Sequence, residues 1–187
     1  MKKILNCLLL FSLVVAFLAV LAKGQSSPTP TTKTAIFAGG CFWCIQPAFD
    51  KANGVVKTVV GYCGGTEPNP TYQLVTSEKT QYREAIEITY DPSKISYGQL
   101  LDIYWRQIDP TQADGQFTDV GPSYRAAIFY ENDEAKKTAE ASKKKARALG
   151  KIRQTDRDRN LAGNEILPRR RVSPEILSAE SGVFWCV

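Results

Sequence analysis

The sequence contains no histidine among its 187 residues. This absence excludes Ser-His and Cys-His catalysis, because both use an imidazole as the base. It also makes a zinc site unfavourable, since the ligands would have to be carboxylates or a few scattered thiols. We therefore expect no bound metal, and any nucleophile in this chain must be activated without histidine.

Cysteine is also scarce, with five residues in the chain. Cys7 lies in an apolar run at the N-terminus, and the other four are Cys41, Cys44, Cys63 and Cys186. Four cysteines permit three complete disulfide pairings, and the sequence does not choose among them.

The N-terminal segment has the layout of a signal peptide. Met1-Lys2-Lys3 precedes an almost purely apolar run over residues 4–22, and a polar linker with two prolines covers residues 23–33. Small residues in Val20-Leu21-Ala22 supply a plausible cleavage point, and an uncleaved membrane anchor is the alternative. Either way, the domain is expected in an extracytoplasmic space, periplasmic or secreted, where disulfides can form.

The positive charge is local. The formal net charge is +5, and residues 136–171 alone hold 13 Lys and Arg against 4 Asp and Glu. Much of this stretch is an amphipathic helix, so a solvated helical face explains the charge better than a nucleic-acid or anionic-membrane surface. No recognised nucleic-acid module accompanies it, and no nucleic-acid partner is expected.

The chemistry of the chain centres on Gly39-Gly40-Cys41-Phe42-Trp43-Cys44, which follows a short apolar run and precedes an expected helix. A thiolate at a helix N-terminus is stabilised by unpaired N–H groups and by the helix dipole, and Cys41 stands at that place. The two glycines permit a tight turn. Phe42 and Trp43 are costly to expose unless they line a pocket. Cys44 has the spacing at which a second thiol can attack an oxidised first one.

Periodicity predicts an α+β fold. Short β-branched or alternating runs indicate strands, and apolar residues at i, i+3 and i+4 indicate helices. The expected elements are a strand at 34–37, a helix at 43–52, strands at 55–62 and 84–90, a helix at 97–108 with Ser96 and Gln99 as a capping box, a strand at 124–130 and a helix at 132–149. An interior Pro47 should limit where the first helix can begin. The order β-α-β-β-α-β is that of a ferredoxin-like two-layer sandwich.

We therefore expect a catalytic domain at 34–150, ending in a C-terminal helix, and an irregular basic tail at 151–187 with one short strand at 165–167. A right-handed crossover makes the first two strands parallel and the other two antiparallel to them. Three segments should then meet at one end of the sheet: the turn at Cys41 and the regions 61–84 and 116–124.

At Gly40-Cys41-Phe42-Trp43 the sequence resembles the peptide methionine sulfoxide reductases of the A class. The likeness covers residues 34–130. It continues through Gly61-Tyr62-Cys63-Gly64-Gly65, Pro70-Thr71-Tyr72, Glu84-Ala85-Ile86, Tyr90-Asp91-Pro92, Asp109-Pro110-Thr111, Gln116, Asp119, Gly121 and Tyr124-Arg125.

The resemblance implies a role for each residue of the central stretch. Cys41 would attack the sulfoxide sulfur, release methionine and be left as a sulfenic acid. Phe42 and Trp43 would hold the methyl group of the substrate. Such enzymes act on the S epimer of the sulfoxide, free or in proteins, and need no cofactor beyond a thioredoxin-like reductant. We expect a monomer.

The resemblance also implies a group of proton donors. Glu84, with the phenols of Tyr72 and Tyr124, would donate a proton to the departing oxygen, and Asp119 would order the site beside them. A carboxyl group can donate near neutral pH only if its pKa is raised, which burial in an aromatic pocket would provide. From the pattern alone, an ordinary charge at a strand edge is the alternative for Glu84.

Three features depart from the family pattern. Cys44 replaces a common glycine, Thr80-Gln81-Tyr82-Arg83-Glu84 replaces Thr-Gly-His-x-Glu, and the usual tail is not recognisable after Gly150. The second thiol that resolves the sulfenic acid is expected to be Cys44, because its spacing requires no movement of another segment.

Two alternatives remain for the resolving thiol. Cys186 would reach the site if the tail swings in. Cys63 is the other, although it fits a buried small hydrophobe equally well.

Two other classes of protein fit the cysteines. A thioredoxin-like Cys-x-x-Cys oxidoreductase would exchange disulfides through Cys41 and Cys44 without reducing sulfoxides. A non-catalytic module would use its four cysteines to hold zinc or two disulfides. Sulfoxide turnover separates both from a reductase.

Overall fold

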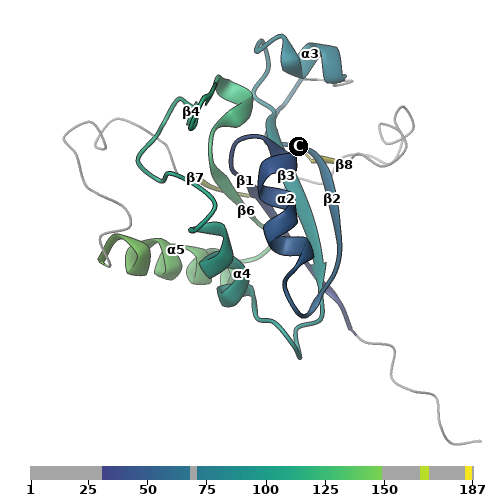
Figure 1. The fold of residues 1–187 in the computed structure, drawn as a ribbon, viewed down its shortest axis with the longest axis vertical. Helices are drawn as coiled ribbons and strands as arrows, with labels where there is room; N and C mark the ends of the chain where they lie inside the picture. Colours follow the sequence, from purple (N-terminus) through teal and green to yellow (C-terminus); the bar gives the residue numbers. More distant parts are fainter. Residues whose placement is uncertain (1–30, 68–70, 149–164, 169–183, 187) are drawn as a thin grey trace, which may run out of the picture. The chain divides into compact units, whose positions relative to one another are not determined.

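The computed structural model describes residues 31–67, 71–148, 165–168 and 184–186 (Figure 1). The expected signal peptide or anchor at 1–22, most of the linker and most of the tail lie outside the described residues and stay predictions. Within the described part, no helix is long and apolar enough to cross a membrane.

A six-stranded sheet forms the centre of the domain, in the order β7-β6-β1-β3-β2-β8. The bounds of its strands are β1 Lys33–Ala38, β2 Val55–Cys63, β3 Arg83–Tyr90, β6 Ala127–Tyr130, β7 Glu165–Pro168 and β8 Phe184–Cys186. Strand β3 is antiparallel to β1 and β2, and β6 is antiparallel to β1. The four inner strands thus have the order and directions predicted for a ferredoxin-like sandwich.

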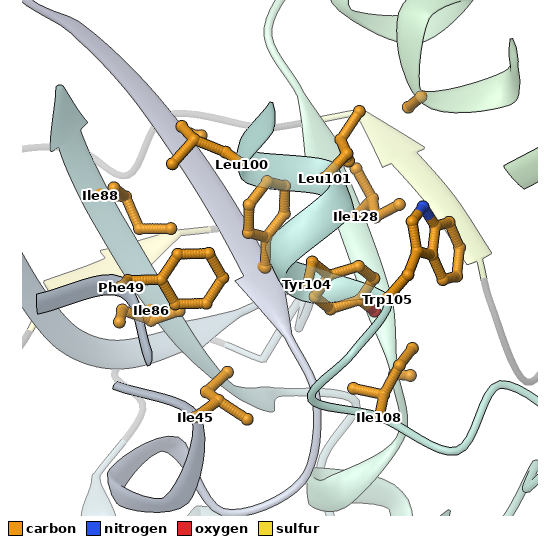
Figure 2. Packing of buried hydrophobic residues seen from close by; sticks show 14 of the residues in the cluster. Ile45, Phe49, Ile86, Ile88, Leu100, Leu101, Tyr104, Trp105, Ile108 and Ile128 are labelled. Atoms are coloured by element: carbon orange, nitrogen blue, oxygen red, sulfur yellow. The ribbon is translucent and has the colours of Figure 1, made fainter. Parts of the chain in front are cut away.

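One face of the sheet is covered by helices α2 (Phe42–Asp50) and α4 (Tyr97–Tyr104), with α5 (Asp133–Ala148) beside α4 (Figure 1). The main hydrophobic core lies between these helices and the strands, and Figure 2 shows its side chains gathered there. Its members include Phe37, Ile45, Phe49, Ile86, Ile88, Leu100, Leu101, Tyr104, Ile108 and Ile128.

Two hydrogen bonds fix the helix layer. The buried Tyr104 hydroxyl donates to the Ala38 carbonyl at 2.9 Å, and the Trp105 indole donates to Ser142 of α5 at 2.8 Å. Because Ala38 ends β1 just before the Gly39-Gly40 turn, the first bond anchors the start of the cysteine segment to the core.

The second face of the inner strands is also apolar. Along β1, Ala35 and Phe37 belong to the helix-side core, whereas Ile36 and Ala38 belong to a second cluster with Phe129. Burial on both faces explains why β1 reads as a continuous apolar run rather than an alternating one.

Several predicted boundaries were wrong. Helix α4 starts at the expected capping box but ends at Tyr104, and i−3 hydrogen bonds tighten the turn that follows it. Strand β6 begins at Ala127, because the residues before it form a 3₁₀ turn, η1 (Pro122–Tyr124). Helix α2 begins at Phe42 although Pro47 lies inside it. The proline has no N–H to donate to the Trp43 carbonyl, so the first turn of α2 lacks one of its usual hydrogen bonds.

Short elements were missed. Helix α3 (Tyr72–Thr76) lies in the long segment before β3, and a small hairpin pairs β4 (Gly115–Gln116) with β5 (Asp119–Val120). These pieces are too short for a periodicity to appear.

Two short pieces of the tail are described, and both are strands. β7, which was predicted, and β8, which was not, extend the sheet at its two edges by parallel pairing. Arg83, 6% exposed, forms an ion pair of 2.7 Å with Glu165 and holds β7 in place.

Candidate active site

Cys41 is the residue before the first turn of α2, as predicted from the sequence. Gly40 has φ +81°, and a Cβ there would lie 2.8 Å from the Cβ of Gln116, so the tight turn requires glycine. The Cys41 carbonyl accepts hydrogen bonds from Cys44 N–H at 2.9 Å and from Ile45 N–H at 3.4 Å. The Cys41 side chain itself makes no capping hydrogen bond within the part of the chain that is described. Cys41 is half-buried, Cys44 is exposed, and both thiols are free.

The two thiols are in contact. A hydrogen bond to Cys41 is the largest cause that raises the pKa of Cys44, followed by burial and by the charges of Cys41, Asp119 and Glu84. Cys44 is therefore held as a protonated thiol that can donate to Cys41.

Glu84 lies at the start of β3 with its carboxylate beside the cysteine helix. It is 6% exposed, and its Oε2 accepts a hydrogen bond from the Phe42 N–H at 3.1 Å. Burial raises the pKa of Glu84 to about 7. The Phe42 N–H acts in the opposite direction, while the charges of Asp119 and Glu78 add to the increase. The reading of Glu84 as an exposed strand-edge charge is thus wrong.

Tyr124 and Asp119 reach the same end of the sheet from η1 and β5. Burial raises the pKa of the Tyr124 phenol, and the charges of Glu84, Asp119, Glu78 and Cys41 raise it further. The phenol therefore remains protonated near neutral pH and can donate a hydrogen bond.

Tyr72 is less engaged than the other predicted donors. It begins α3 and is 43% exposed, and within the described residues its hydroxyl makes no hydrogen bond. The structure therefore brings Glu84, Tyr124 and Asp119 within electrostatic range of one another, and leaves Tyr72 exposed.

Phe42 and Trp43 differ in their surroundings. Phe42 is 4% exposed and packs against Tyr62 with ring centroids 5.7 Å apart. Trp43 is 65% exposed and meets Phe42 edge to face at 5.1 Å. The Phe42 ring is thus buried next to the cysteine turn, and the Trp43 ring offers exposed apolar surface beside it.

Tyr82, which stands where the Thr-Gly-His-x-Glu pattern has histidine, packs in a buried aromatic cluster. Tyr82 is fully buried against Phe42, Tyr62 and Val75, and its hydroxyl donates to the Glu67 carbonyl at 3.2 Å. It thereby supports the loop that leads out of β2.

Cys63 is not a free thiol, because it is disulfide-bonded in this structure. The parallel pairing of β2 with β8 places Cys63 and Cys186 in register along their backbones. In this state Cys63, one of the alternatives for the resolving thiol, has no thiol to offer. Among the side chains that the structure describes, Cys44 is the free thiol beside Cys41, and Cys186 stays an alternative.

Two residues of the site were given no role from the sequence. Gln116 is 1% exposed, exchanges two hydrogen bonds with the backbone of Asp109, and packs against Gly40. Glu78 precedes β3, and its carboxylate bonds to Ser123. Gln116 lies in the two-residue strand β4 and Glu78 in a turn, and neither place gives a periodic signal from which these contacts could be predicted.

One cavity of the described residues lies away from the cysteine segment. A cavity of about 360 Å³ is lined by residues at the Lys33 end of β1, among them Tyr90, Tyr97 and Glu131. Since Cys41 follows the other end of β1, this cavity plays no part in the cysteine chemistry.

Comparison with known proteins gives one consistent family. The sequence model of the family described as peptide methionine sulfoxide reductase matches residues 33–156. The peptide methionine sulfoxide reductase MsrA of Bacillus licheniformis is 57% identical over 111 residues, which are 59% of this chain and 61% of that protein. MsrA of Bacillus subtilis is 55% identical over 116 residues, which are 62% and 66% of the two chains. The chain thus spans less than two thirds of the length of these relatives.

Solved structures agree on the fold. Methionine sulfoxide reductase A of Corynebacterium diphtheriae superposes with a TM-score of 0.60 at 31% identity, over 85% of this chain and 71% of that one. Mxr1 of Saccharomyces cerevisiae in its reduced form gives a TM-score of 0.64 at 24% identity, over 77% and 78% of the two chains, and shares the fold.

Proposed function

This chain belongs to the peptide methionine sulfoxide reductase family, and we propose that it reduces methionine S-sulfoxide, free or in proteins, to methionine. The observation that carries the proposal is the hydrogen bond from the Phe42 N–H to Glu84, because it puts a carboxyl group of raised pKa next to a free thiol at a helix start. A nucleophile and an acid that lie beside one another suit a reaction in which a sulfur atom is attacked and an oxygen atom is protonated.

In the first step the Cys41 thiolate attacks the sulfoxide sulfur while Glu84 gives its proton to the sulfoxide oxygen. The sulfur–oxygen bond of the substrate breaks, and the oxygen with its proton is transferred to Cys41 as a sulfenic acid. Methionine sulfur is reduced by two electrons and Cys41 is oxidised by two. Phe42 and Trp43 provide apolar surface for the methyl group, and Tyr124 donates a hydrogen bond to the oxygen.

In the second step Cys44 attacks the sulfenic sulfur of Cys41. The Cys41–Cys44 disulfide forms, and the hydroxyl leaves as water with the proton of the Cys44 thiol. The bridge needs the first turn of α2 to loosen, and Pro47 favours this because it leaves the Trp43 carbonyl without its helical partner.

An external dithiol such as a thioredoxin-like protein would then reduce the disulfide and restore both thiols. Exposure of Cys44 supports direct access for such a reductant. No cofactor is needed for any of these steps, and within the described residues no group of His, Cys, Asp and Glu side chains could hold a metal ion.

The function is tested by turnover with dithiothreitol against the two epimers of methionine sulfoxide. We expect reduction of the S epimer and none of the R epimer. A protein that reduces disulfides but neither sulfoxide would be a thioredoxin-like oxidoreductase, and a protein inert in both assays would be a non-catalytic module. Either outcome rejects the proposal.

Replacing Cys44 with serine should separate the two steps. We expect Cys44→Ser to release one methionine per chain in a single turnover and then to stall as a sulfenic acid with thioredoxin, because no neighbouring thiol can form the bridge. A small thiol should restore turnover. The measurement is methionine release together with peptide mass mapping of the oxidised protein. A Cys41–Cys186 bridge with Cys44 free in the wild type, and normal thioredoxin-dependent turnover of the variant, would contradict Cys44 as the resolving thiol.

A further inference from the structure

Glu78, in the turn between α3 and β3, has both carboxylate oxygens engaged by a segment distant in sequence. Its Oε1 accepts a hydrogen bond from the Ser123 hydroxyl at 2.6 Å, and its Oε2 accepts one from the Ser123 N–H at 3.1 Å. Ser123 is 3% exposed and directly precedes Tyr124. One carboxylate thus ties the turn before β3 to the 3₁₀ turn that carries Tyr124.

The backbone on both sides is shaped around this carboxylate. Glu78 itself has φ 58°, a left-handed conformation that costs a residue with a side chain about 1 kcal/mol or more. Gly121 has φ 150°, and a Cβ there would lie 2.7 Å from Oε2 of Glu78. Glu78 thus keeps a strained backbone conformation, and Gly121 leaves room for its carboxylate because it has no Cβ. Both features indicate that the fold fixes the position of this carboxylate.

The carboxylate also acts through its charge. The negative charge of Glu78 raises the pKa of Glu84 and that of Tyr124. The charge of Glu78 therefore favours the protonated state of both donors, Glu84 and Tyr124. Its hydrogen bonds to Ser123 also fix the position of the turn that carries Tyr124.

We propose that Glu78 is a positioning residue for proton donation: its carboxylate clamps the Tyr124 turn against the start of β3, so that Glu84 and Tyr124 face one substrate oxygen. The inference rests on the proposed sulfoxide reduction. Glu78 is assigned no contact with the substrate, since its oxygens are occupied by Ser123.

Three variants separate the effect of the Glu78–Ser123 hydrogen bonds on the rate from the effect of the Glu78 charge. Ser123→Ala removes the 2.6 Å bond and keeps the charge, so the single-turnover rate should fall about threefold at every pH. Glu78→Gln keeps an acceptor for the Ser123 N–H and removes the charge. Glu78→Ala removes both, and its rate near pH 7 should fall about tenfold or more.

Glu78→Gln provides a readout that a purely structural residue would not change. Without the charge of Glu78 the pKa of Glu84 falls, so the decline of the rate with rising pH should move to lower pH by roughly half a unit. The rates of variant and wild type should then agree near pH 5.5 and differ severalfold near pH 8. The other groups that face Glu84 are unchanged in this variant: the Phe42 N–H, Asp119, Tyr124, Cys41 and Cys44.

The experiment is a single-turnover pH profile for the wild type and all variants, with thermal unfolding as the check on folding. Lys79→Ala changes the exposed neighbour of Glu78 and should match the wild type in both. Reduction of the S-sulfoxide by the wild type is established first, so that failure of the proposed function is seen before any variant is compared.

Two results would overturn the inference. One is a set of folded variants that all keep the wild-type rate and the wild-type pH midpoint. The other is a loss of thermal stability in Glu78→Ala while its rate, measured where the protein is fully folded, equals that of the wild type. Since Ser123→Ala keeps the charge and the backbone bond, it remains informative even if Glu78→Ala does not fold.

Discussion

Replacing Cys41 with serine is expected to abolish sulfoxide reduction, even with excess dithiothreitol. A serine hydroxyl is not ionised near neutral pH, and it has no sulfur that could accept oxygen and later pass into a disulfide. The single-turnover rate should fall by at least about a thousandfold, which corresponds to about 4 kcal/mol of barrier. The measurement is methionine released per chain from the S-sulfoxide.

Serine is a well-matched replacement because Cys41 occupies the capping position of α2 without capping it. A serine hydroxyl there can accept a hydrogen bond from an N–H of the first turn, which is worth up to about 1 kcal/mol of stability. We therefore expect Cys41→Ser to fold at least as well as the wild type, so that lost activity cannot be attributed to unfolding. Cys44→Ser, which keeps the first step, is the control. Residual turnover of Cys41→Ser within about tenfold of wild type, or 1.4 kcal/mol, would show that Cys41 is not the nucleophile.

The position of Cys41 was predictable from local chemistry. Two glycines, an apolar strand before them and an amphipathic helix after them define a strand–turn–helix corner, and the structure confirms it with Gly40 at φ +81° and Cys41 at the helix start. The sheet order was also predictable, because the β-α-β-β-α-β order and a right-handed crossover leave few other arrangements. That topology is what brings β3 and η1 to the thiol.

The placement of Glu84 and Tyr124 at the site depended on information that local pattern does not carry. In the alternating strand Glu84 shares the face of Ile86 and Ile88, and Glu87 lies on the opposite face; Glu84 is 6% exposed while Glu87 is only partly buried. The alternation does not show that the N–H of Phe42 in α2 meets the Glu84 carboxylate. Tyr124 was expected in a strand, and it lies instead in a short 3₁₀ turn fixed by a bond between distant residues, Glu78 and Ser123. Long-range hydrogen bonds of this kind have no sequence period.

The charge state of Glu84 makes the pH dependence of the first step predictable. Its pKa is raised to about 7, mainly by burial, so the carboxyl group is protonated below pH 7 and loses its proton above it. If it is the acid, the wild-type single-turnover rate should decline as the pH rises through about 7. A carboxyl of ordinary pKa would instead place this decline near pH 4 to 5.

Glu84→Gln is expected to remove that acid and at the same time to stabilise the folded protein. The amide can still accept the Phe42 N–H, but it has no proton to transfer, so the first step should slow by roughly a hundredfold or more near pH 7. The pKa of Glu84 is higher in the folded state than in the unfolded state, so its protonation stabilises the folded state below about pH 4. This stabilisation is lost as the pH rises through 7.

The neutral amide should therefore raise the free energy of unfolding at pH 8, by about 2 kcal/mol. Denaturant unfolding at pH 8 measures this gain, and the single-turnover rate on the same sample measures the loss. Slower reduction by a more stable protein cannot arise from a damaged fold, whereas an unchanged single-turnover rate would remove Glu84 from the proton transfer and leave it as a buried structural carboxyl.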